Sequence, residues 1–91
     1  MTEPTSVLDR SLELAPQVSV RPERFGALLY HFDTRKLSFL KHPDLVRVVE
    51  SLDAHDSVRD TFVAIGLDER RWPSFLAALA TLETSEMISV A

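Results

Sequence analysis

The sequence of 91 residues contains no cysteine and only two glycines, Gly26 and Gly66. Without cysteine the chain forms no disulfide and offers no thiolate as a nucleophile or metal ligand. Two isolated glycines cannot make a glycine-rich phosphate loop. No apolar run approaches the roughly 20 residues of a membrane span, and the acidic start does not resemble a secretory signal. We therefore expect a cytoplasmic protein with no membrane partner.

Positive charge is scarce overall but locally concentrated. The net charge is −4, made of −2 over residues 1–14, +2 over residues 15–50 and −4 over residues 51–91. A basic stripe between positions 35 and 47 holds four cations and one acid: Arg35, Lys36, Lys41, Arg47 and Asp44. An acidic chain argues against non-specific nucleic-acid binding, whereas a local basic stripe can attract a small acidic partner.

Apolar alternation predicts two short strands in the first half of the chain, at residues 17–21 and 36–40. Residues 27–32 are apolar on both parities, so the period alone does not exclude a helix, but their short length, their aromatic pair and the turn that follows favour a third strand. A turn at residues 33–35 joins the second and third strands into a hairpin. Residues 1–15 show no clear period and are predicted to be a mobile N-terminal arm, so that residues 16–91 form the domain. In the third strand Leu37 and Phe39 share one face, and Lys36, Ser38 and Leu40 share the other.

Beyond Lys41 the apolar period changes from two to 3.6 residues, which predicts three helices. Pro43 suits the first position of a helix, and Ser57 with Asp60 resembles a capping box. The third helix is expected near Pro73, with Trp72 extended just before it. Its apolar stripe consists of Phe75, Leu76, Leu79 and Leu82. The order strand-strand-strand-helix-helix-helix predicts an α+β fold, a small winged-helix-like domain with a three-stranded antiparallel sheet followed by three helices.

Catalytic patterns are absent from the sequence. The three histidines, His31, His42 and His55, lack the close spacing of a metal motif. The acidic pairs lie in expected connections between helices, and no local nucleophile motif is present. We therefore expect a protein that is not an enzyme and that needs no cofactor or metal.

Composition and element order leave two kinds of non-enzymatic function open. A winged helix can bind DNA, but the second helix offers one cation, Arg59, and the third offers none between Pro73 and Glu86. The basic stripe can also be plain solvated surface on a domain that only joins other proteins into an assembly. A small DNA-binding regulator is therefore one function that the sequence leaves open, and an assembly adaptor is the other.

Three stretches carry a family resemblance: Pro16–Glu23 (PQVSVRPE), Phe25–Phe32 (FGALLYHF) and Arg35–Lys41 (RKLSFLK). They resemble the peptide chaperones of mycofactocin biosynthesis, which belong to the PqqD-like RiPP recognition elements. The resemblance covers about half of the chain strongly. Asp33 stands at a turn position where the family often has glycine, and aspartate tolerates such conformations well.

The resemblance implies a chaperone that binds the leader of a ribosomally made precursor peptide and presents it to a radical SAM maturase. In this family the leader adds as a strand to the edge of the third strand, in a groove closed by the third helix. The leader is acidic, which agrees with the basic stripe. The residues expected to bind the peptide are therefore Arg35, Lys36, Leu37, Ser38, Phe39, Leu40, Lys41, Arg71, Phe75, Leu76, Leu79 and Leu82. The sequence leaves open which helix positions face the groove rather than the core.

Overall fold

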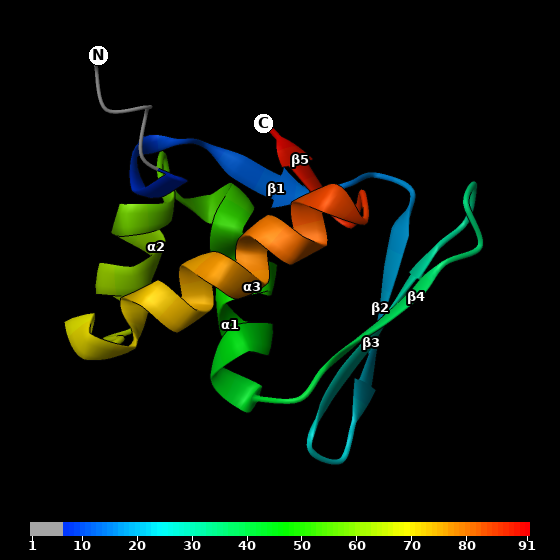
Figure 1. Ribbon diagram of the computed structural model, residues 1–91, viewed down its shortest axis with the longest axis horizontal. Coiled ribbons are helices and arrows are strands. Elements are labelled where there is room, and N and C mark those ends of the chain that lie inside the picture. The colour runs from blue at the N-terminus through cyan, green and yellow to red at the C-terminus, as the bar shows by residue number, and fades with distance from the viewer. Residues whose placement is uncertain (1–6) are drawn as a thin grey trace.

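A three-stranded antiparallel sheet in the order β2-β3-β4 forms one side of the molecule, and the helices pack against one face of it (Figure 1). The computed structural model describes residues 7–91. The strands are β2 Val18–Glu23, β3 Gly26–His31 and β4 Leu37–Leu40, and the helices are α1 Pro43–Ser51, α2 Val58–Ala64 and α3 Trp72–Thr84. This arrangement confirms the predicted α+β class with three sheet strands followed by three helices.

The helix boundaries follow from local chemistry. Pro43 occupies the first turn of α1, where its missing N–H would have no partner within the helix. The hydroxyl of Ser57 accepts a hydrogen bond of 3.1 Å from the backbone N–H of Asp60 at the start of α2. Gly66 follows α2 with a φ of +75°, the left-handed conformation that favours glycine. Short 3-10 turns lie at η1 Val7–Asp9, η2 Leu52–Ala54 and η3 Glu69–Arg71.

Trp72 is helical, which corrects the prediction that it is extended. Its φ and ψ are −55° and −45°, and it is the first residue of α3. Its indole N–H donates a hydrogen bond of 3.1 Å to the carbonyl of Leu67, and its ring lies 5.4 Å from that of Phe62. These contacts, with the preceding turn η3, outweigh the bias that Pro73 places on its neighbour.

The N-terminal segment is folded from residue 7 onward, which corrects the predicted arm over residues 1–15 for its described part. β1 Leu12–Leu14 pairs antiparallel with β5 Ile88–Val90, and Leu12 is 1% exposed. The rest of the predicted arm, residues 1–6, lies outside the described residues. The two strands come from opposite ends of the described chain, so no local pattern indicates their pairing.

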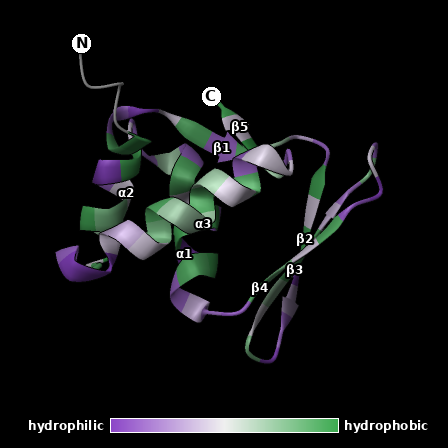
Figure 2. Cartoon of the chain, viewed as in Figure 1, coloured by the Kyte–Doolittle hydropathy of each residue, from purple (hydrophilic) through white to green (hydrophobic). Residues whose placement is uncertain are grey.

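The strand alternation separates a buried face from an exposed one. Ala27, Leu29 and His31 of β3 are buried, and Leu40 of β4 joins them at 3% exposed. These residues meet a core built mainly by the helices: Leu45, Val48, Val49, Leu52, Val58, Phe62, Phe75, Leu79 and Leu82. Hydrophobic residues occur in the strands as well as the helices (Figure 2). One face of the sheet therefore holds the helices in place, and the other is left to solvent.

At Gly26 the backbone of β4 comes too close to β3 for a side chain, since a Cβ there would overlap the carbonyl oxygen of Leu40. We predict that Gly26→Ala lowers the free energy of unfolding by about 1–3 kcal/mol, the usual cost of overpacking. Urea denaturation of the variant and the wild type would measure the change. Ser19→Ala, at an exposed position of β2, is the control and should leave stability nearly unchanged. A Gly26→Ala protein as stable as the wild type would contradict the close approach.

Candidate functional site

β4 has one open edge. β3 lies between β2 and β4, and no strand of the described residues pairs with the far side of β4. The backbone N–H of His31 donates to the carbonyl of Lys36 at 3.0 Å, which makes these residues a hydrogen-bonded pair. Hydrogen-bonded positions alternate in an antiparallel ladder, so Ser38 also turns its backbone toward β3. The backbone groups of Leu37 and Phe39 therefore point to the open side.

A groove runs between this open edge and α3. One part of it, about 310 Å³, is lined by Ser38, Phe39, Leu40, Leu45, Ala78, Thr81 and Leu82. A second part, about 370 Å³, is lined by His42, Leu45, Arg71, Ser74, Phe75 and Ala78. Leu45 and Ala78 line both parts, so the two hollows adjoin. We call them together the β4–α3 groove.

Small side chains on α3 leave room for the groove. Ser74, Ala78 and Thr81 stand at positions i, i+4 and i+7, which lie on one face of a helix. Larger residues on that face would fill the space beside β4. None of these three residues is among those that the sequence predicts to bind the peptide, and neither are His42 and Leu45. The interruption of the apolar stripe by small residues at helical spacing is the signal that could have indicated them.

The four helix residues expected in the groove separate into two groups. Phe75 and Leu82 line the groove, at 6% and 5% exposed. Leu79 is fully buried in the core, and Leu76 is half-buried against the core and lines neither part of the groove. The apolar stripe of α3 therefore serves mainly the core, and only its border reaches the groove.

The strand residues expected to bind the peptide also fall into two groups, those that line the groove and one that does not. Ser38, Phe39 and Leu40 line the groove, whereas the side chain of Leu37 is 60% exposed and lines a hollow on the opposite face of the sheet. Three cations flank the edge without lining the groove: Arg35, Lys36 and Lys41. None of the three forms an ion pair within residues 7–91. Their charges are available to a ligand.

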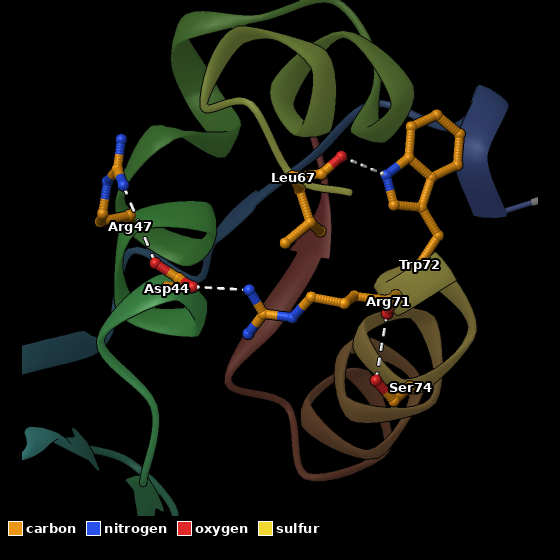
Figure 3. A network of polar contacts seen from close by, with 6 residues as sticks. All are labelled: Asp44, Arg47, Leu67, Arg71, Trp72 and Ser74. Atoms are coloured by element: carbon orange, nitrogen blue, oxygen red, sulfur yellow. Dashed lines mark hydrogen bonds and ion pairs between the residues drawn. The ribbon is translucent and has the colours of Figure 1, made fainter. Parts of the chain in front are cut away.

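Arg71 is already partnered, unlike the cations beside β4. Its guanidinium donates a hydrogen bond of 2.8 Å to Asp44 and lies 5.0 Å from the centre of the Phe75 ring (Figure 3). Asp44 also forms an ion pair of 3.8 Å with Arg47. Arg71 therefore joins the start of α3 to the first turn of α1 at the end of the groove. It shapes the groove more than it adds free positive charge.

The two groups with a shifted pKa lie away from the groove, and the described residues hold no metal-binding cluster. Within residues 7–91 no cluster of three histidine or acidic side chains could hold a metal ion. Hydrogen bonds from the backbone and side chain of Arg70 lower the pKa of Asp68, and a side-chain hydrogen bond to Glu83 raises the pKa of Arg10. Neither shifted group lines the groove. Apolar walls beside unpaired backbone groups are suited to holding an extended peptide.

Two other properties bear on possible partners. No helix in the described part of the chain is both long and apolar enough to cross a membrane. Arg59, the one cation of α2, forms an ion pair of 3.1 Å with Asp9. This pairing leaves α2 without an unpaired cation for base contacts.

Comparison with known proteins gives a consistent result. Residues 11–89 match the family described as the Peptide chaperone MftB family. A "Peptide chaperone MftB" from Mycobacterium ulcerans is 51% identical over 80 residues, covering 88% of this chain and 73% of the relative. Proteins of the same name from Mycobacterium tuberculosis and Mycolicibacterium smegmatis are 48% and 50% identical over the same share of this chain, covering 73% and 78% of their own lengths. No solved structure matches the chain.

Proposed function

The chain belongs to the peptide chaperone MftB family, whose members are named as chaperones and not as catalysts, and from this we propose the following specific role. The chain binds the leader of a ribosomally made precursor peptide by adding it as a strand to β4. It then presents the rest of the peptide to a radical SAM maturase of mycofactocin biosynthesis. The chain itself takes no part in the chemistry, and we expect the process to take place in the cytoplasm.

The observation that carries this proposal is the open edge of β4 beside an apolar groove. The outward backbone groups of Leu37 and Phe39 provide donors and acceptors at the spacing of the next strand. A peptide strand placed there would lie about 4.8 Å from β4, within the space between β4 and α3. Backbone hydrogen bonds hold any extended sequence, so they supply affinity with little demand on side chains.

Selection among peptides would come from the groove walls. Alternate side chains of an added strand point to the same face, so every second leader residue would face Leu45, Ala78 and Leu82. These walls are apolar, and they favour apolar leader residues at those positions. Ala78 lies where both parts of the groove meet, so its small size sets the space available to the central residue.

The sheet segment carries charge that suits an acidic leader. Residues 18–41 contain five cations and two acids, a net charge of +3 in a chain whose total is −4. Arg35, Lys36 and Lys41 flank the edge without ion pairs to the described residues. Such charges mainly accelerate association with an oppositely charged partner.

The central test is calorimetric titration with the precursor peptide and with a version that lacks its leader. We expect one-to-one binding that is lost with the leader. Phe39→Pro removes one outward N–H from β4, and it should weaken leader binding by about tenfold or more. Phe39→Ala removes the side chain but keeps this N–H, and it is the matched control. Pro is tolerated at an edge position of this kind, so the variant should remain folded.

Two results would contradict strand addition. One is a folded Phe39→Pro protein that binds the leader as tightly as Phe39→Ala. The other is equal binding of the precursor with and without its leader. Ser38→Pro is less informative, because the Ser38 N–H faces β3 and its removal breaks the sheet itself.

The groove is tested by filling it. We predict that Ala78→Leu lowers leader affinity by about tenfold, because the added side chain occupies the space beside β4 and overpacking costs about 1–3 kcal/mol. Ala80→Leu, on an exposed part of the same helix, is the matched control. Calorimetry with thermal unfolding of both variants separates a binding loss from a folding loss. Unchanged binding by Ala78→Leu would place the leader elsewhere.

The electrostatic contribution is tested by kinetics. We predict that Lys36→Glu with Lys41→Glu slows leader association at low salt, and that the difference from wild type shrinks as salt rises. Each exposed charge contributes only about 0.2–1 kcal/mol, so dissociation should change less. Stopped-flow measurement across a salt series gives both rates. Arg70→Glu, at a side chain 91% exposed on the helical side, is the control. Association that does not depend on salt would exclude steering.

A further inference from the structure

The face of the sheet turned away from the helices is unusually apolar. Six large side chains lie on it or at its ends, and we call them the outer sheet face: Phe25, Leu28, Tyr30, Phe32, Leu37 and Phe39. Six large hydrophobic residues are exposed in the described chain, and four of them belong to this face: Phe25 at 69%, Leu37 at 60%, Phe32 at 55% and Phe39 at 47%. The exposed apolar surface is therefore concentrated here.

The outer sheet face has recesses that can receive side chains. One hollow of about 240 Å³ is lined by Glu23, Arg24, Phe25, Leu28 and Phe39. A second of about 290 Å³ is lined by Ser19, Arg21, Leu28, Tyr30 and Leu37. Leu28 lines both, so the hollows adjoin across the middle of the sheet. Tyr30 and Phe32 meet edge to face, with ring centres 5.7 Å apart. Such a shaped apolar surface can receive the side chains of another protein.

Folding does not require these side chains to be apolar. An antiparallel sheet with one buried face normally carries polar residues on the other. β2 follows this rule, with Ser19 and Arg21 at its outer positions. β3 and β4 break it at four outer positions, Leu28, Tyr30, Leu37 and Phe39, although their inner positions already supply the core. A contiguous apolar patch of this kind marks an interaction surface.

The charges around the outer sheet face indicate the character of the partner. Arg21 and Arg24 line its hollows beside a single acid, Glu23, and neither arginine forms an ion pair with the described residues. All cations that do form ion pairs lie outside the sheet: Arg10, Arg47, Arg59, Arg70 and Arg71. Two copies of this chain would bring segments of +3 together, which opposes self-association through this face. A partner whose surface is apolar and has carboxylates at its rim would be complementary to the outer sheet face.

We propose that the outer sheet face is the docking surface for the enzyme that modifies the bound peptide, through an apolar patch on that enzyme with acidic residues around it. This inference rests on the proposed function, which assigns the edge of β4 to the leader. Leu37 and Phe39 present backbone groups at that edge and side chains on the outer face. One strand thus contacts the peptide and the enzyme, which places the leader beside the docked enzyme.

The test measures two affinities for each variant, with the purified radical SAM maturase and with the precursor peptide as separate ligands. Phe25→Ser with Phe32→Ser removes two exposed aromatic residues from the ends of the face. Arg21→Glu with Arg24→Glu reverses its charge and keeps its apolar side chains. We expect each double variant to lose about tenfold or more in maturase affinity, the loss typical of removing interface anchors. Precursor affinity should remain that of wild type for the aromatic double variant, and for the arginine double variant at salt high enough to screen the charge of the sheet.

Matched controls come from the opposite side of the molecule. Val63→Ser changes a residue of α2 that is 65% exposed, and Arg70→Glu reverses an exposed charge outside the sheet. Neither should alter maturase affinity. Sedimentation velocity of the wild type and of Phe25→Ser with Phe32→Ser tests for self-association through the same face.

Four results would decide the matter. Wild-type maturase affinity in both double variants would overturn the docking surface, as would a wild type that binds the precursor but not the maturase. A wild-type dimer that the aromatic double variant converts to monomer would assign the face to a second copy and overturn the inference. A wild type that binds the maturase through this face but not the precursor would support the docking surface and refute leader binding.

Discussion

The structure depends on an imbalance in backbone hydrogen bonding at β4. This strand has donors and acceptors on both sides, and only one side is paired, with β3. An unpaired edge invites aggregation, and proteins usually protect it with charge or short length. β4 has both protections, since it is four residues long and has Lys36 and Lys41 beside its ends. These cations repel a second copy of the same edge and attract an acidic strand, so protection and the proposed recognition come from the same residues.

β4 contributes to three surfaces, which are the core, the outer sheet face and the open edge. It does so because its side chains and its backbone groups alternate in direction. Leu40 points into the core at 3% exposed, whereas Leu37 points to the outer face at 60%. The backbone of Leu37 and Phe39 faces the open edge, and that of Ser38 faces β3. A shift of one residue in register would exchange these roles together. Gly26, which permits the close approach to Leu40, therefore matters for the proposed recognition as well as for the fold.

Local signals were sufficient to predict the main elements, and non-local contacts account for what was missed. Alternation indicated β2 and β4, a short apolar run before a turn indicated β3, and Ser57 indicated the start of α2. Each of these patterns is contained in a few consecutive residues. The pairing of β1 with β5 joins the two ends of the chain and has no local pattern. The same limit applies to Arg71, whose partner Asp44 lies on another helix.

The candidate groove shows a different limit of sequence reasoning. The apolar stripe of α3 was used to choose groove residues, but hydrophobicity first identifies what the core needs. Leu79 is fully buried for that reason, whereas Ala78, beside it in sequence, lines the groove. A binding groove beside a strand needs space that side chains do not fill. Small residues at helical spacing therefore indicate such a groove better than an apolar stripe does. Which backbone groups of β4 face outward also depended on the turn, through the hydrogen bond between His31 and Lys36.

The net charge of −4 conceals an electrostatic polarity that links the groove and the outer sheet face. Residues 18–41 carry +3, so the other residues of the chain carry −7. An acidic peptide is repelled by the helical side and attracted to the sheet, which orients it before contact. At physiological salt this field decays over about 8 Å, so it acts only near the surface. The same polarity favours an acidic partner on the outer face, since both surfaces share one positively charged sheet. In the proposed function, this polarity of a three-stranded sheet directs two acidic partners to adjacent sites.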